Sequence, residues 1–363
     1  MGPLSGYRII EVVGIGPGPF AGMMFADMGA EVIVVDRAGA GLLSLTVDIN
    51  RRGKRSIELD LKSEAGKEIF LKLCETADAL FEGYRPGVME KLGLGPDDVA
   101  AANPKLVYGR MTGWGQTGPL SDTAGHDINY IALSGALHAV GPADGPPTVP
   151  LNLIADYGGG GMMLAFGLVC ALLEAQKSGK GQTIDVSMVE GSSALMSLFH
   201  SLMASGLWAQ ERGVNMLDGG AHFYGTFETA DGEYVSFGAI EPQFMQVFID
   251  KTGLDASWMQ NHMNPVEWPR LKTELADLFK TKTTAQWLEL LGGTDACFAP
   301  ILPFWEAHKH PHNVARESFI EVDGVIQPAP TPKFSRTKPK VTHGPSDKGA
   351  DTDTLLRELD AKS

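Results

Sequence analysis

The chain has few of the features that mark secreted or membrane proteins. It holds three cysteines in 363 residues, Cys74, Cys170 and Cys297, with no CxxC pair, and all three lie in mainly apolar stretches. We therefore expect buried, reduced thiols in a cytoplasmic protein. The N-terminal stretch lacks a charged segment followed by a long apolar one, so no signal peptide is predicted. The most apolar run, residues 162–173, is too short to span a bilayer and predicts a core helix.

Positive charge is also scarce. The chain has 30 lysine and arginine residues against 44 aspartate and glutamate residues, and its net charge is −14. A protein this acidic is a poor general binder of nucleic acids and anionic membranes, so we predict neither as a partner. An anionic ligand would need a local basic cluster, and RRGKR at 51–55 is one. This cluster is either a solvated loop or, because arginine binds phosphate through two parallel hydrogen bonds, a site for a phosphorylated ligand.

The order of apolar runs predicts two domains. Residues 8–36 follow a strand, turn, helix, strand pattern, and strands continue to alternate with helices to about residue 190. Such alternation predicts an α/β domain with a parallel, doubly wound, Rossmann-like sheet. Further on, Asp231 and Gly232 predict the turn of a β-hairpin, and amphipathic helices follow. The predicted boundaries are 1–205 for the large domain, 206–222 for a glycine-rich linker, 223–327 for a small α+β domain and 328–363 for an extended tail that returns to the large domain.

The glycine-rich turn after the first strand, GIGPGP at 14–19, is similar to a dinucleotide-binding fingerprint, and Asp36 closes the next strand. The glycine spacing differs from the fingerprint, and Pro17 and Pro19 lack the N–H donors that would hold a pyrophosphate. We therefore interpret the segment as a turn that lets the backbone approach a ligand or another helix, which argues against a nicotinamide or flavin enzyme.

Two ionisable residues, His126 and Asp127, stand at the start of an apolar helical segment. Asp127 could serve as a helix N-cap, and His126 as a capping or core residue. A functional interpretation is also open. The backbone N–H groups at a helix start face any oxyanion placed there, and the helix dipole favours a neutral histidine, which suits a general base.

Asn152 and Asp156 lie four residues apart and share one face if a helix covers both. Asp156 precedes an almost wholly apolar segment, so partial desolvation would raise its pKa and make it a usable acid, although a second helix cap is an equal alternative. Glu241 follows a strand and precedes a proline, which alone says little. The histidines at 308–312 lack the spacing of metal ligands, no GxSxG motif occurs, and no metal site is predicted.

Several longer stretches carry a family resemblance. LSGYRIIEVVGIGPGP, FEGYRPGVMEKLGLGP, RMTGWGQTGP, AGHDINY, PLNLIADYGGGG, GGAHFYGTFETADGEYVSFGAIEPQF and PKFSRT together resemble the family III CoA-transferase superfamily, from the first strand to about residue 336. Within that superfamily, GHDINY combined with NLIADYGGG resembles the branch of racemases that act on 2-methylacyl-CoA thioesters.

The resemblance implies an interlocked homodimer with the active site between the large domain of one subunit and the small domain of the other. It implies that His126 and Asp156 are the two acid/base residues, that Asn152 supports Asp156, and that the partner subunit's Glu241 orients His126. The implied CoA contacts are Arg37, Leu59, Asp60, Leu61, Lys62, Gly83, Tyr84, Arg85, Lys91 and the segment from Gly125 through Ile128 and Asn129 to Tyr130.

The chemistry agrees with this assignment. Interconverting (R)- and (S)-2-methylacyl-CoA by 1,1-proton transfer requires one group to remove the α-proton and another to deliver a proton to the opposite face. A histidine and a desolvated aspartate have proton affinities close enough for both directions. The intermediate enolate needs a donor, which the backbone N–H of Asp127 supplies. The thioester stays bonded and CoA is part of the substrate, so no metal or redox cofactor is predicted; RRGKR and Arg37 would supply cations for the CoA phosphates.

Three rival functions remain. A CoA-transferase of the same fold would use Asp127 as a nucleophile, but transfer needs neither His126 nor the Asn152 and Asp156 pair, which favour the racemase. A nonenzymatic CoA-ester binding protein would require His126 and Asp156 to lie far apart. A nicotinamide dehydrogenase is disfavoured by the two prolines of the turn. The acyl group stays open among branched fatty acyl, sterol side-chain and 2-arylpropionyl groups.

Overall fold

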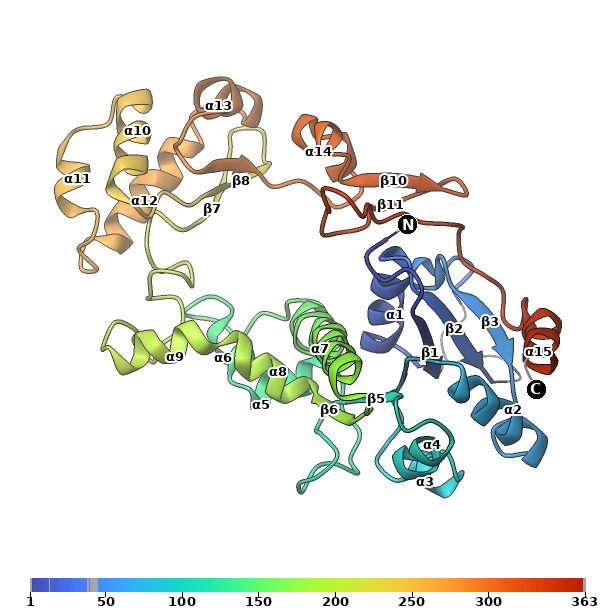
Figure 1. Ribbon diagram of the computed structural model, residues 1–363. Helices are drawn as coiled ribbons and strands as arrows, with labels where there is room; N and C mark the ends of the chain where they lie inside the picture. Colours follow the sequence, from blue (N-terminus) through green and yellow to red (C-terminus); the bar gives the residue numbers. More distant parts are fainter. Residues whose placement is uncertain (1, 13, 38, 40–44, 362–363) are drawn as a thin grey trace. The chain divides into compact units, whose positions relative to one another are not determined.

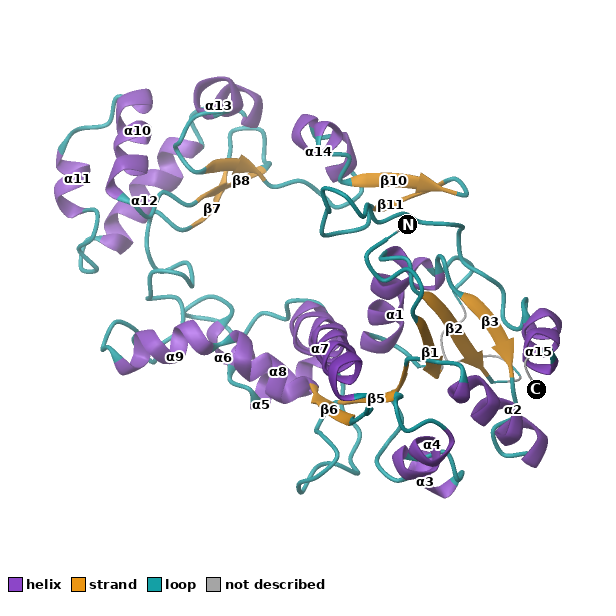
Figure 2. Ribbon diagram, in the orientation of Figure 1, coloured by secondary structure: helices purple, strands orange, loops and turns teal. Residues whose placement is uncertain are grey.

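A six-stranded parallel sheet forms the centre of the first unit of the chain (Figures 1 and 2). The computed structural model describes residues 2–12, 14–37, 39 and 45–361. The strand order is β3-β2-β1-β4-β5-β6, and every neighbouring pair is parallel. This order is that of doubly wound nucleotide-binding folds and confirms the predicted α/β class. The strands are β1 (Arg8–Val12), β2 (Glu31–Asp36), β3 (Arg55–Glu58), β4 (Ala79–Glu82), β5 (Val107–Thr112) and β6 (Thr183–Ser187).

Helices cover this sheet because its central strands are apolar on both faces. Ile9, Ile10, Ile33 and Leu80 are fully buried, as expected for parallel strands between two helical layers. The helical segments of the first unit are α1 (Pro17–Asp27), η1 (Ile49–Arg51), α2 (Glu64–Glu75), α3 (Val88–Lys91), α4 (Pro96–Ala102), α5 (Asp127–Leu133), η2 (Leu153–Gly161), α7 (Met162–Ser178), α8 (Met188–Leu195) and α15 (Thr352–Asp360).

The second unit is built on a small antiparallel sheet with a separate aromatic core. Phe237, Phe248, Phe279 and Trp287 pack together and are buried. The predicted hairpin is present, with Asp231 and Gly232 in its turn. The elements are α6 (Ala136–Ala139), α9 (Ser197–Ala204), β7 (Gly225–Glu228), β8 (Tyr234–Phe237), α10 (Pro242–Thr252), α11 (Ser257–Asn261), α12 (Trp268–Phe279), α13 (Thr284–Leu291), β9 (Phe298–Pro300) and η3 (Ala307–Lys309); α14 (Pro311–Ala315) lies at the boundary.

The division into units differs from the predicted boundaries. The first unit holds residues up to 134, 150–196 and from 314 onward, and the second holds 135–149 and 197–313. The segment 135–149 joins the second unit because Arg212 donates hydrogen bonds to the backbone oxygens of His138 (2.9 Å), Pro142 (3.1 Å) and Gly145 (2.5 Å). One guanidinium thus attaches a stretch that the sequence analysis assigned to the large domain.

Residues after 313 return to the first unit through a buried guanidinium. Arg52 is 1% exposed and donates to Gln327 Oε1 and the Pro328 carbonyl, both at 2.8 Å. This anchors the hairpin of β10 (Phe319–Val322) and β11 (Val325–Pro328), which the sequence analysis placed in the small domain. The tail is not extended throughout, because α15 packs beside β3 and buries Leu355 and Leu359 in the core (Figure 1).

Two expectations about apolar features need correction. The helical stretch Leu153–Ser178 has 26 residues, so it is longer than the predicted core helix and is long and apolar enough to cross a membrane. Core helices of soluble proteins pass the same test, and 44% of its most apolar window is buried, against β5, β6 and α1. All three cysteines are free, but only Cys74 is buried; Cys170 and Cys297 are exposed, contrary to expectation.

Candidate active site

His126 lies at the end of the loop that leaves β5, directly before helix α5. Its backbone is extended (φ −134°, ψ 173°), and it is the N-cap residue of that helix. Asn129 Oδ1 accepts a hydrogen bond from the His126 backbone N–H at 3.0 Å. The Tyr130 hydroxyl donates to the Gly125 carbonyl at 2.5 Å, which fixes the preceding residue as well. The imidazole is held on an ordered helix start and is exposed.

The Asp127 carboxylate caps a different helix from its own. Asp127 is the first residue of α5, not its N-cap, and is 5% exposed. Its Oδ2 accepts hydrogen bonds from the backbone N–H groups of Ala155 (2.7 Å) and Asp156 (2.8 Å). These are donors in the first turn of η2 that lack acceptors within that helix. Among the described residues, no acceptor binds the backbone N–H of Asp127, so it is free to hold a substrate oxygen.

The segment that carries Asp156 is a π-helix, η2, in which the N–H of Met162 reaches the carbonyl of Tyr157, five residues back. π-Helical geometry is rare in proteins and frequently occurs at functional sites. Its glycines permit close packing on α8, since a Cβ at Gly159 would lie 2.6 Å from the Ser192 nitrogen. The π-helical turns and the glycines therefore bring the backbone that carries Asp156 close to α8.

Asp156 is surrounded by the groups that the sequence analysis singled out. Asn152 Nδ2 donates to Asp156 Oδ2 at 3.1 Å, which confirms that the two share one face. Burial raises the pKa of Asp156 above its usual value, the Asn152 hydrogen bond opposes this rise, the Asp127 charge adds to it, and His126 opposes it. His126 and Asp127 are therefore close enough to Asp156 to act on it electrostatically.

The GIGPGP turn approaches the same carboxylate. Gly16 has φ +70°, and a Cβ there would lie 3.1 Å from Asp156 Oδ2. The turn thus packs against the π-helix, as expected for a turn that lets the backbone approach another helix. A larger residue at position 16 would displace the Asp156 side chain.

The predicted CoA contacts follow several parallel strands at one edge of the sheet. Arg37 follows β2, Leu59 follows β3 and Gly83 follows β4, so these positions share the carboxyl edge, where such folds bind ligands. The exposed members are Arg37, Asp60, Lys62, Gly83, Arg85, Lys91, Ile128 and Asn129; Leu61, Tyr84 and Gly125 are half-buried, and Leu59 and Tyr130 are buried.

A family model for CoA-transferase family III matches residues 4–352. The chain belongs to this family. It is 48% identical to mouse alpha-methylacyl-CoA racemase over 98% of this chain and 93% of that protein, and 46% identical to the human racemase over 92% and 87%. Among solved structures, it is similar to a CaiB/BaiF family protein from Brucella suis, with a TM-score of 0.83, 25% identity and 99% of each chain covered.

In this family III member, the basic cluster at 51–55 does not provide free cations. Arg51 pairs with Asp36 at 2.6 Å, and the bidentate guanidinium of Arg52 binds Asp27 at 2.5 and 3.0 Å. The remaining two pair elsewhere: Lys54 with Glu11 at 2.5 Å, and Arg55 with Glu31 and Glu358 at 2.6 and 2.8 Å. The expectation that RRGKR serves the CoA phosphates is therefore wrong, because internal carboxylates take all four cations.

Glu241 belongs to the second unit, at the N-cap of α10, and is exposed. Its own side chain makes no capping hydrogen bond. Its predicted action on His126 across a dimer interface stays a prediction.

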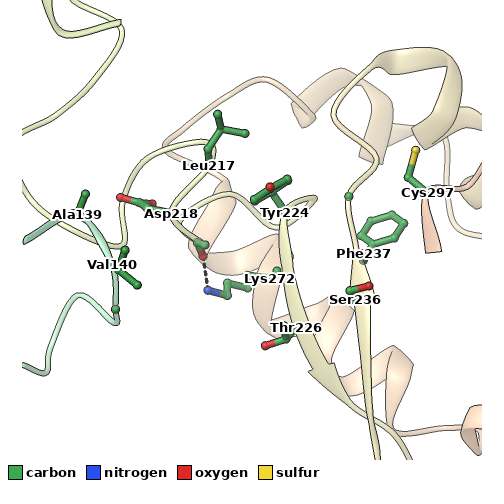
Figure 3. Close-up of a pocket in the computed structure, with 14 residues that line it drawn as sticks. Ala139, Val140, Leu217, Asp218, Tyr224, Thr226, Ser236, Phe237, Lys272 and Cys297 are labelled. Carbon is green, nitrogen blue, oxygen red and sulfur yellow. Dashed lines mark hydrogen bonds between the residues drawn. The ribbon is translucent and has the colours of Figure 1, made fainter. Parts of the chain in front are cut away.

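The second unit also contains a cavity of about 610 Å³ that the sequence did not reveal (Figure 3). Leu217, Tyr224, Phe237, Lys272 and Cys297 line it, and the Lys272 ammonium is held by the Gly219 carbonyl. Its walls come from six separate stretches of chain with no shared motif, so no local pattern predicts it.

Glu82 and Arg110, two charged residues within apolar strands, were not among the predicted site residues. Both are buried, and they contact each other at the edge of the sheet next to the predicted CoA contacts. The signal was present, since a charge within a buried strand requires a partner.

Proposed function

We propose that this chain is a racemase that interconverts (R)- and (S)-2-methylacyl-CoA thioesters by 1,1-proton transfer. The observation that carries the proposal is the position of the Asp127 carboxylate, which ties the helix headed by His126 to the backbone of Asp156. Two acid/base groups are thereby fixed relative to each other on separate helices. The similarity to the mouse and human racemases supports the same reaction.

In the proposed reaction, one of the two residues takes the α-proton and the electron pair moves to the thioester oxygen. The Asp127 backbone N–H stabilises this enolate oxygen, a type of interaction worth about 3 kcal/mol of barrier. The other residue then delivers its proton to the opposite face of the α-carbon. Burial raises the pKa of Asp156 above its usual value, which favours an exchange of acid and base roles between the two groups in the two directions.

The transferase alternative fits this site less well. A nucleophilic Asp127 would have to reach the thioester carbonyl, but its Oδ1 is buried and its Oδ2 accepts hydrogen bonds from two backbone donors. A transferase also has no use for the hydrogen-bonded Asn152 and Asp156 pair. The geometry favours a positioning role for the Asp127 carboxylate over a chemical one.

The surroundings of the site complete the proposal. Arg37, Lys62, Arg85 and Lys91 are exposed and provide the positive charge for the anionic part of CoA. We further propose an interlocked homodimer in which the partner's Glu241 orients His126, in the cytoplasm. The acidity of the α-carbon in a thioester makes the two bases and the N–H donor sufficient, so the mechanism requires no metal or redox cofactor.

The test is one enantiomer of a 2-methylacyl-CoA in D₂O with a free carboxylic acid present. Circular dichroism follows chirality and NMR follows the α-proton. We expect loss of optical activity, deuterium at the α-carbon and no CoA on the free acid. His126→Ala and Asp156→Ala should each abolish racemisation. Transfer of CoA to the acid with chirality retained would refute the proposal.

A further inference from the structure

A buried carboxyl group, Glu82, lies at the carboxyl edge of the sheet and takes no part in the proposed proton transfer. It is the last residue of β4, which neighbours β1 at the point where the strand order reverses. It is 1% exposed, although it ends a strand and precedes a loop. Burying a carboxyl group costs free energy because the group loses its hydration, so a buried carboxyl group requires specific hydrogen-bonding or charged partners.

The two partners of Glu82 are the loop that follows its strand and an arginine on the neighbouring strand. Its Oε2 accepts a hydrogen bond from the Tyr84 backbone N–H at 2.6 Å, and its Oε1 lies 3.3 Å from Arg110 Nε. Arg110 stands directly opposite on β5, and its two terminal nitrogens bind Glu90 on α3 at 2.7 and 3.2 Å. One charged network therefore connects β4, β5, α3 and the loop that begins at Gly83.

This network reaches the residues proposed to hold CoA. The Tyr84 N–H is the middle donor of the loop Gly83–Arg85, and Lys91 directly follows Glu90 on α3. In the same loop, the Arg85 side chain makes a long contact of 3.4 Å to the Asp122 carbonyl. We propose that Glu82 is a positioning residue for CoA binding, which acts through the Tyr84 N–H on the conformation of the Gly83–Arg85 loop. The inference rests on the proposed function.

The network also gives CoA binding a pH dependence. Burial raises the pKa of Glu82 to about 7. The groups that face it are Arg110 and Tyr108 from β5, Glu90 from α3 and Tyr84 from its own loop. Burial raises the pKa of both tyrosines. Burial also acts to raise the pKa of Glu90, but its hydrogen bond to Arg110 helps to lower that pKa below the usual value. Glu82 is therefore the member of this group that titrates near neutrality. Protonation below pH 7 removes the charge that holds the Tyr84 N–H.

The experiment is calorimetric titration of the full-length protein with dephospho-CoA, which has no phosphomonoester that titrates between pH 6 and 8. Wild-type affinity should fall about fivefold from pH 8 to pH 6, the equivalent of one net hydrogen bond. Glu82→Gln can satisfy Tyr84 or Arg110 but not both, so it should bind about fivefold more weakly at pH 8 and show no pH dependence. With a 2-methylacyl-CoA, KM should rise in proportion and kcat should stay unchanged.

Glu90→Gln is the matched control, because Glu90 contacts the same Arg110 but not the Gly83–Arg85 loop. It should keep the wild-type affinity at pH 8, and its loss of affinity should begin at a lower pH, since the Glu90 charge contributes to raising the pKa of Glu82. Glu82→Asp, which keeps the charge but is too short to reach Tyr84, replaces the glutamine variant if that fails to fold, and should also weaken binding. A wild-type affinity for dephospho-CoA that is constant from pH 8 to pH 6 overturns the inference, and so does a folded Glu82 variant with unchanged affinity. In either case, racemisation by the wild type leaves the proposed function intact. Absence of racemisation of a 2-methylacyl-CoA by the wild type overturns both.

Discussion

Replacing Asp127 by asparagine distinguishes a racemase from a transferase at one position. The amide oxygen of asparagine can still accept hydrogen bonds from the backbone N–H groups of Ala155 and Asp156, which now lie 2.7 and 2.8 Å from Oδ2. The substitution removes the negative charge and any nucleophilic role. If the carboxylate only positions the helices, Asp127→Asn should keep racemase activity within about tenfold, whereas loss of a nucleophile costs about 10⁴-fold or more.

The matched variant Asp127→Ala has a different expected outcome. It leaves the Ala155 and Asp156 N–H groups without acceptors, and Ala155 is fully buried. An unsatisfied buried donor costs about 1–3 kcal/mol, so the unfolding free energy should fall by roughly 2–4 kcal/mol. The first turn of η2 should also shift, and a displacement of about 1 Å at a reacting group costs about 100-fold in rate. The asparagine variant should therefore keep most of the stability and racemase activity that the alanine variant loses.

The assays are racemisation by circular dichroism, CoA transfer to a free acid, and urea unfolding of the wild type and both variants. The asparagine variant should also show a lower pKa for Asp156 in its pH–rate profile, since the Asp127 charge contributes to raising it. A folded, stable Asp127→Asn protein with racemase activity reduced by about 10⁴-fold would refute the positioning role and favour a nucleophilic role for Asp127. Equal stability of the alanine variant and the wild type would contradict the capping role.

Three further outcomes follow from other contacts. Gly16→Ala should lower kcat about tenfold, because its Cβ would lie 3.1 Å from Asp156 Oδ2, whereas Gly6→Ala, with a similar positive φ but open space around it, should cost only about 1 kcal/mol of stability and no rate. Arg52→Met should lower the unfolding free energy by about 3–5 kcal/mol in urea, since it strands a buried carboxylate; a loss below about 1 kcal/mol would contradict this. Burial lowers the pKa of His222 to about 3, so the unfolded chain takes up a proton that the folded chain does not as pH falls below about 6.5; stability relative to His222→Phe should drop by about 2 kcal/mol between pH 7 and pH 5, and parallel pH curves would refute it.

The central strands β1 and β2 were predictable because each is mainly apolar. A parallel strand packed on both faces has no polar side, so RIIEV and EVIVVD stand out in the sequence and match β1 and β2 closely. The neighbours of β6 were not predictable, since it pairs with β5 after an excursion of 70 residues through α5, η2 and α7. Nothing local in TIDVS specifies that pairing.

The candidate site was predictable where its signals are local. The helix start at His126 and the spacing of Asn152 and Asp156 are short-range patterns, and both are present in the structure. The basic cluster at 51–55 was misinterpreted for the opposite reason. Its cations are adjacent in sequence, whereas their carboxylate partners are dispersed from Glu11 to Glu358, so the cluster looks unpaired until the chain is folded.

The contact between Asp127 and η2 could not be predicted either, yet it explains why both local patterns occur in one protein. A π-helix bonds each N–H to a carbonyl five residues back, so more N–H groups at its start lack an internal acceptor than in an α-helix. Asp127 supplies an acceptor for two of them from the start of the helix that His126 heads. Because one carboxylate satisfies the donors beside Asp156 and fixes the backbone beside His126, stability and the relative placement of the two proposed bases depend on the same hydrogen bonds. Substitutions at position 127 should therefore change both together.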